Sequence, residues 1–86
     1  MYSINPRILH TPISEGKILL LEPKQGLYFE LNEVSSLIFE GIQNNQNESE
    51  ILDMIIQSFD VCKDEATSDM KSLIDEFRSN NIITKK

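Results

Sequence analysis

Gly26-Leu27-Tyr28-Phe29-Glu30-Leu31-Asn32-Glu33 is the stretch at which this chain changes from strand to helix. Its apolar residues, Leu27, Phe29 and Leu31, are each separated by one residue, which is the period-two pattern of a half-buried strand. Asn32 predicts the end of that strand, because its side chain can accept hydrogen bonds from the first free N–H groups of a helix. We therefore expect sheet before this stretch and helix after it.

Two further strands are predicted before it, at residues 7–13 and 17–21. Pro6 and Pro12 confine the first of these strands to a sheet edge, because proline has no N–H to donate to a neighbouring strand. The connections between the strands are short turns, and such turns join antiparallel neighbours. The first 31 residues therefore predict a three-stranded antiparallel meander whose third strand covers residues 27–31.

Three helices are predicted after the meander. The first covers about residues 33–42, the second begins with a capping box of Asn47 and Glu50, and the third ends near residue 80. The apolar residues expected on their inner faces are Val34, Leu37, Ile38 and Ile42 in the first, Ile51, Leu52, Ile55, Ile56 and Phe59 in the second, and Ala66, Met70, Leu73, Ile74 and Phe77 in the third. Ile82 and Ile83 form an apolar tail that we expect to pack back. The prediction is one α+β domain over residues 1–86, similar in layout to a winged helix-turn-helix.

Charge is unevenly distributed along the chain. The net charge is −6, and residues 1–31 carry three bases and three acids, so residues 32–86 hold five bases against eleven acids. An acidic helical half disfavours nucleic acid as a partner, because binding phosphates requires a basic face. No apolar run is long enough for a membrane span, and residues 1–10 lack the pattern of a signal peptide. With its single cysteine, Cys62, the chain is expected in a reducing, cytoplasmic setting.

No group of residues predicts catalysis, a metal site or a cofactor. His10 is the only histidine and lies in the proline-flanked strand, and Cys62 has no histidine nearby in the sequence. There is no glycine-rich loop for phosphate binding. We therefore expect a protein that is not an enzyme.

The strand-to-helix stretch resembles the PqqD-like leader-binding domains, which are the recognition elements of ribosomally synthesised and post-translationally modified peptides. The segments that carry the resemblance are residues 26–33, Ile38, Glu50-Ile51, residues 59–62, Glu65-Ala66, Asp69-Met70, Leu73-Ile74 and residues 81–83. The resemblance as a whole covers roughly residues 6 to 84. Cys62 departs from the pattern, because the family more often has serine or aspartate at the start of the third helix, and a thiol is a poor helix cap.

The resemblance implies an adaptor without catalytic activity. Members of the family bind the leader of a precursor peptide and deliver it to a modifying enzyme or leader peptidase, as in lasso-peptide and radical-SAM systems. The leader is added as a strand beside the third strand, in a groove shared with the third helix.

The third strand is suited to such a role on physical grounds as well. It contains no proline, so its free backbone groups can pair with an extended peptide, while side-chain pockets provide specificity. The predicted peptide-binding residues are Leu27, Tyr28, Phe29, Glu30 and Leu31 on the strand and Asp69, Met70, Leu73, Glu76 and Phe77 on the third helix. Asp69 and Glu76 would favour a leader that carries Lys or Arg. Plain core packing remains the alternative for Met70, Leu73 and Phe77.

Two other functions, DNA binding and protein–protein adaptation, are alternatives for this sequence. The fold also fits a winged-helix DNA-binding regulator, but residues 63–80 carry three bases against five acids, which is the wrong sign for a recognition helix. An acidic protein–protein adaptor is a further alternative. An open strand edge can also pair with its own copy, so a homodimer is possible.

Overall fold

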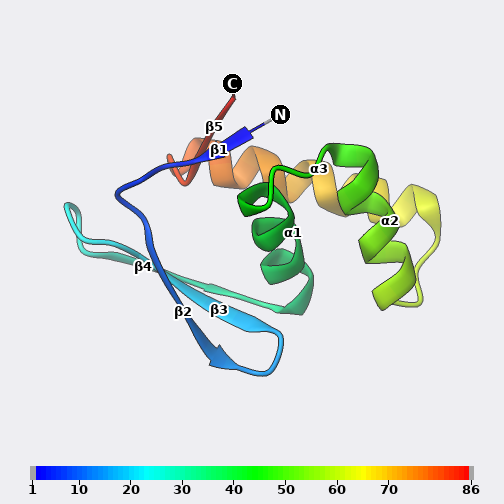
Figure 1. The fold of residues 1–86 in the computed structure, drawn as a ribbon, viewed down its shortest axis with the longest axis horizontal. Coiled ribbons are helices and arrows are strands. Elements are labelled where there is room, and N and C mark those ends of the chain that lie inside the picture. Colours follow the sequence, from blue (N-terminus) through cyan, green and yellow to red (C-terminus); the bar gives the residue numbers. More distant parts are fainter. Residues whose placement is uncertain (1, 86) are drawn as a thin grey trace.

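The computed structural model describes residues 2–85 of the chain. The elements, labelled in Figure 1, are β1 (Tyr2–Ile4), β2 (Leu9–Ser14), β3 (Lys17–Glu22), β4 (Leu27–Leu31), α1 (Glu33–Gln43), α2 (Glu48–Ser58), α3 (Lys63–Ser79) and β5 (Ile83–Lys85). Within residues 2–85, no helix is both long and apolar enough to cross a membrane. The predicted order of a meander followed by three helices is confirmed.

The central sheet has the strand order β2-β3-β4, and both pairs are antiparallel. The predicted position of the first meander strand at a sheet edge is therefore confirmed, since among residues 2–85 β2 pairs only with β3. The register of β2 shifts between Pro12 and Ser14, whereas β4 pairs with β3 without a break from Leu27 to Leu31. Gly16 and Gly26 close the two turns with positive φ angles of 72° and 68°, a conformation that glycine adopts without strain.

A second sheet was not predicted from the sequence. β1 and β5 pair antiparallel, with Tyr2 opposite Lys85 and Ile4 opposite Ile83. Ile82 and Ile83 are buried, so the apolar tail does pack back, but it does so partly as a strand whose partner is at the other end of the chain. Each strand has three residues, too few for a period-two pattern to be recognised.

The predicted helix caps are present. Asn32 Oδ1 accepts the Ser35 N–H at 2.9 Å, and Asn47 and Glu50 form both hydrogen bonds of the capping box. Cys62, the N-cap residue of α3, makes no side-chain cap hydrogen bond, as expected for a thiol. After α3, Asn81 adopts a left-handed φ of 59°, a conformation that asparagine tolerates at the end of a helix.

The inner face of α1 differs from the prediction. The buried residues include Ser35, Ser36 and Phe39, whereas Val34 and Leu37 are only half-buried. The predicted stripe is therefore confirmed at Ile38 and Ile42, which are buried, but it missed the two serines, because it assigned no inward role to a serine. Ser36 faces inward because its hydroxyl hydrogen-bonds to backbone groups of β3 and β4, as described below.

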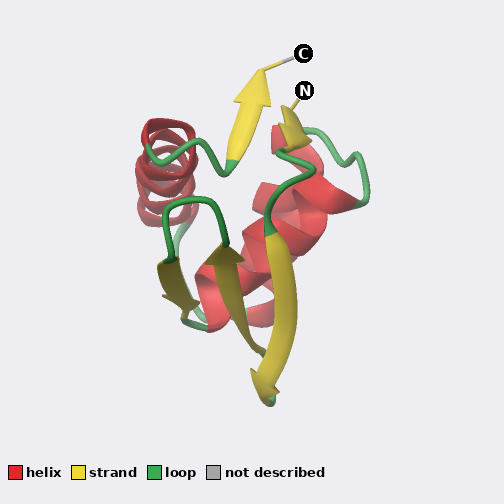
Figure 2. Cartoon of the chain, turned by 90° about the vertical axis from the view of Figure 1, so that its left-hand side faces the viewer, coloured by secondary structure: helices red, strands yellow, loops and turns green. Residues whose placement is uncertain are grey.

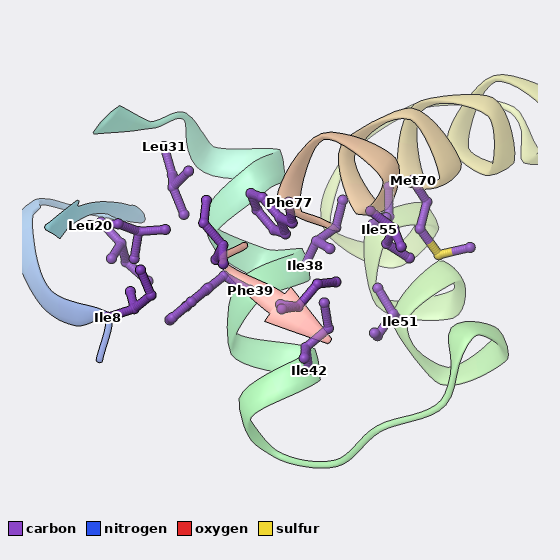
Figure 3. Close-up of a cluster of buried hydrophobic side chains, with 14 of the residues drawn as sticks. Ile8, Leu20, Leu31, Ile38, Phe39, Ile42, Ile51, Ile55, Met70 and Phe77 are labelled. Carbon is purple, nitrogen blue, oxygen red and sulfur yellow. The ribbon is translucent and has the colours of Figure 1, made fainter. Parts of the chain in front are cut away.

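The helices cover one face of the central sheet, and the core lies between these two layers (Figure 2). Figure 3 shows side chains of the sheet, such as Leu20, meeting Phe39 of α1 and Phe77 of α3. The rings of Phe39 and Phe77 meet edge to face, with centroids 6.4 Å apart. Of the apolar residues predicted to face inward on α2, Ile51 and Ile55 are buried and Leu52, Ile56 and Phe59 are half-buried.

Candidate functional site

β4 is an unpaired edge of the central sheet, and Ser36 shows which of its backbone groups are free. The Ser36 hydroxyl accepts the Ile18 N–H at 3.0 Å and donates to the Leu31 carbonyl at 3.3 Å. Ile18 and Leu31 are opposite each other in the register of β3 and β4. Both groups therefore point into the space between these two strands, where the hydroxyl bridges them.

The direction of the other β4 backbone groups follows from this bridge. The N–H and C=O of one strand residue point to the same side, and the side alternates from residue to residue. Since Leu31 faces β3, Phe29 and Leu27 face β3 as well, and Tyr28 and Glu30 direct their N–H and C=O groups away from the sheet. The position of Pro12 opposite Ile18 agrees with this alternation, because its missing N–H would then lie on the outer side of β2.

The free edge of β4 lies on a groove of about 310 Å³ between β4 and α3. The lining comes from four segments of the chain: β4, the first turn of α1, the second half of α3 and the residues that follow it. These residues are Tyr28, Phe29, Glu30, Leu31, Ser35, Leu73, Glu76, Phe77, Asn80 and Ile82.

The groove has an apolar floor and a polar rim. Leu31, Phe77 and Ile82 are almost fully buried and belong to the core, while Phe29 and Leu73 are half-buried against it. Tyr28 is 68% exposed, and Glu30 and Glu76 are also exposed. Side chains alternate between the two faces of a sheet, so Glu30 contributes its outward backbone groups to the groove, while its side chain lies on the face opposite to Leu31. The site therefore offers apolar contact area at its base and the Glu76 carboxylate on α3, which suits an extended peptide with an apolar and a basic side chain.

The groove beside β4 stays open because other elements of the fold hold α3 in place. α3 packs on α2 and on β5, and in Figure 2 its end lies above β4 at the same side of the molecule. The Ile82 N–H donates to the Phe77 carbonyl at 2.8 Å, and its carbonyl accepts the Asn5 N–H at 2.8 Å. The chain that enters β5 is thus fixed at the end of α3, and the space along β4 stays open.

Seven of the ten residues predicted from the sequence line this groove, namely Tyr28, Phe29, Glu30, Leu31, Leu73, Glu76 and Phe77. Leu27 is 42% exposed at the start of β4 and lies outside the lining. Asp69 is exposed on α3, one turn before Leu73, and also lies outside it. Met70 is 2% exposed and points toward Ile51 and Ile55 of α2 (Figure 3), so it is a core residue.

Sequence reasoning missed three lining residues, Ser35, Asn80 and Ile82. Asn80 could have been found, because it follows Leu73, Glu76 and Phe77 at helical spacing on the same face. Ile82 was recognised only as part of an apolar tail. No local signal distinguishes Ser35, which enters the lining because α1 starts directly at the end of β4.

The histidine and the cysteine, the other side chains that are often reactive, lie outside the groove lining. Gln43 Nε2 and His10 Nε2 lie 2.9 Å apart, and the His10 ring packs on Phe39 at a centroid distance of 5.6 Å. Cys62 is a free, exposed thiol. Among residues 2–85, no group of three or more His, Cys, Asp or Glu side chains is arranged to hold a metal ion.

Comparisons with known proteins agree with this geometry. A family model described as coenzyme PQQ synthesis protein D (PqqD) matches residues 17–83. The fold is similar to that of a solved structure described as TbiB1 in complex with the TbiA(beta) leader peptide, with a TM-score of 0.88, 20% identity, and coverage of 98% of this chain and 96% of that one. It is also similar to a lasso peptide synthetase B1 complexed with the leader peptide, with a TM-score of 0.86, 18% identity and 98% coverage of both chains. No curated protein sequence matches this chain.

Proposed function

Because this chain belongs to the PqqD family, we propose that it binds the leader segment of a precursor peptide and delivers it to a modifying enzyme or leader peptidase. The leader adds as a fourth strand along β4 and fills the groove between β4 and α3. The observation that carries this proposal is the free β4 edge, whose outward backbone groups at Tyr28 and Glu30 open onto that groove. The two structurally similar proteins described above are complexes with leader peptides, which supports it.

Backbone pairing alone gives little sequence preference, so side chains must select the leader. An apolar leader side chain that is buried on Phe29, Leu73 and Phe77 contributes about 1.5–3 kcal/mol. A micromolar complex requires about −8 kcal/mol in total. One paired strand with one or two buried side chains is therefore sufficient, and Glu76 adds a preference for Lys or Arg beside the apolar side chain.

We infer that the protein acts by binding, without a reaction of its own. Its partners are then the precursor peptide and the enzyme that modifies or cleaves it. We place this function in the cytoplasm, which suits the free, exposed thiol of Cys62. The free β4 edge can also pair with β4 of a second copy, in which case leader binding competes with dimerisation.

An amide NMR titration tests the proposal, with the leader of the precursor peptide encoded beside the gene for this chain. We expect shifts concentrated at residues 28–31 and 73–82. Shifts centred on β2 or on α2 would contradict the proposed edge, and the absence of any binding would contradict the function. Duplex DNA is the comparison ligand, and specific binding of DNA in place of the leader would favour the winged-helix alternative.

A matched pair of variants tests the groove. Leu73→Ala removes an apolar side chain from the groove, and we expect the leader affinity to fall about tenfold, equivalent to about 1.4 kcal/mol. Leu52→Ala removes the same atoms from a half-buried leucine on α2, outside the groove lining, and should leave the affinity unchanged. Equal effects of the two variants would mean that Leu73 acts only through the stability of the fold.

A further inference from the structure

A second cavity, of about 380 Å³, continues the groove beyond the start of β4. It lies where the β1–β2 connection, the β3–β4 turn and the chain after α3 meet. Its lining is Asn5, Pro6, Arg7, Glu22, Lys24, Gln25, Asn80, Asn81 and Thr84. Asn80 lines both the groove and this cavity, so a peptide that lies along β4 toward Leu27 reaches the cavity next.

The walls of this cavity are held by hydrogen bonds between segments that are distant in the sequence. Asn5 Nδ2 donates to the Asn81 carbonyl at 2.8 Å, and the Asn5 N–H donates to the Ile82 carbonyl at 2.8 Å. The Arg7 N–H donates to Asn5 Oδ1 at 3.0 Å. The backbone that carries Arg7 is therefore fixed against the end of α3, so binding has to order the Arg7 side chain but not its backbone.

The charge of the cavity is opposite to that of the groove. Arg7 and Lys24 line the cavity, and within residues 2–85 neither forms an ion pair. Glu22 is the only carboxylate in the lining, and its Oε2 accepts the Gln25 N–H within the turn. The cavity lining therefore has a net charge of +1, from two cations and one carboxylate. The groove lining carries Glu30 and Glu76 and no cation, which gives −2.

We propose that the precursor peptide that lies along β4 extends into this cavity and places an Asp or Glu side chain between Arg7 and Lys24. This inference rests on the function proposed above and specifies the recognised peptide further. Its charge pattern complements the two linings, with a basic residue at Glu76 and an acidic residue at Arg7 and Lys24. At about 3.3 Å per strand residue, the five residues of β4 set the spacing between them at about four to six residues. This pair of charges selects the direction in which the peptide lies along β4.

A charge-reversal experiment with the complete chain tests this proposal, with a fluorescein-labelled leader of the neighbouring precursor as the probe. We expect Arg7→Glu/Lys24→Glu to weaken leader binding by about tenfold or more, because two attractive contacts become repulsive. The control is Lys17→Glu/Lys71→Glu, which changes the net charge by the same amount at exposed cations outside both cavities. The control should bind the leader like the wild-type protein.

Leaders in which each Asp or Glu is changed to Lys, one at a time, identify the residue that occupies the cavity. One of them should bind Arg7→Glu/Lys24→Glu at least as tightly as the unchanged leader binds the wild-type protein. The inference is overturned, with the proposed function intact, if the double variant binds the unchanged leader normally or if no leader variant restores affinity. If the wild-type protein itself does not bind the leader, the proposed function fails, and this inference fails with it.

Discussion

The two edge strands of the central sheet, β2 and β4, have six and five residues and the same partner, β3, but their free sides differ. β2 contains Pro12 and an irregular register beside it, and all six of its residues are exposed. β4 has no proline, keeps an unbroken register, and its free side opens onto the groove with α3. Proline and irregular pairing are known means of preventing an edge strand from pairing with another chain.

This difference indicates that the chain protects one edge and leaves the other available. An unprotected edge normally favours aggregation, so its presence beside an apolar groove is consistent with a site that an extended peptide covers. If this interpretation is right, changes at the β4 edge should affect leader binding, and equivalent changes at the β2 edge should not.

The largest effect is expected from proline on the free side of β4. Glu30→Pro removes an outward N–H, and we expect leader affinity to fall roughly 10- to 100-fold while the fold is retained. His10→Pro removes an outward N–H from β2, and leader affinity should not change. Phe29→Pro removes an N–H that faces β3, so this variant should lose cooperative unfolding. Circular dichroism on heating and fluorescence anisotropy with the labelled leader measure the two properties.

A second variant, Glu30→Ala, separates the loss of the Glu30 charge from the loss of its N–H. It should retain most of the affinity that Glu30→Pro loses. If Phe29→Pro folds and binds normally, or if His10→Pro abolishes binding, the direction of the β4 backbone groups or the choice of edge is wrong.

A smaller effect is expected at the bridge between β3 and β4. Ser36→Ala leaves the buried Ile18 N–H and Leu31 carbonyl without their hydroxyl partner, and should reduce the free energy of unfolding by about 1–3 kcal/mol. Urea unfolding measures this change. Ser72→Ala, at an exposed position of α3, is the control and should change stability by less than about 0.5 kcal/mol. Equal stabilities of the two variants would mean that the bridge does not hold β4 in place.

The smallest effect is expected at the start of α3, the helix beside the β4 edge. Cys62→Ser supplies the side-chain cap that the thiol does not, and should raise the free energy of unfolding by about 0.5–1 kcal/mol. Cys62→Ala supplies none and serves as the control. Leader affinity should be the same for both, because Cys62 does not line the groove. A change in affinity with Cys62→Ser would show that the start of α3 also affects the peptide site.

Local patterns in the sequence were sufficient for most of the fold. The meander, the three helices, the Asn32 cap and the Asn47–Glu50 capping box each depend on residues within a few positions of one another. The burial of Ser36 on α1 could not be predicted in the same way. Ser36 is buried because its hydroxyl hydrogen-bonds to backbone groups of β3 and β4, at Ile18 and Leu31. The spacing of apolar residues along a helix does not reveal such a contact with a sheet.

For the candidate site, the sequence by itself determined the strand with a free edge and the face of α3 that carries Leu73, Glu76 and Phe77. Only the tertiary structure decided that Met70 belongs to the core, that Asn80 and Ile82 line the groove, and that Arg7 and Lys24 line one cavity beside it. These placements depend on the pairing of β1 with β5, which joins the two ends of the chain and fixes the end of α3. Neither strand has a local signal of its own, because what stabilises each is a partner about 80 residues away.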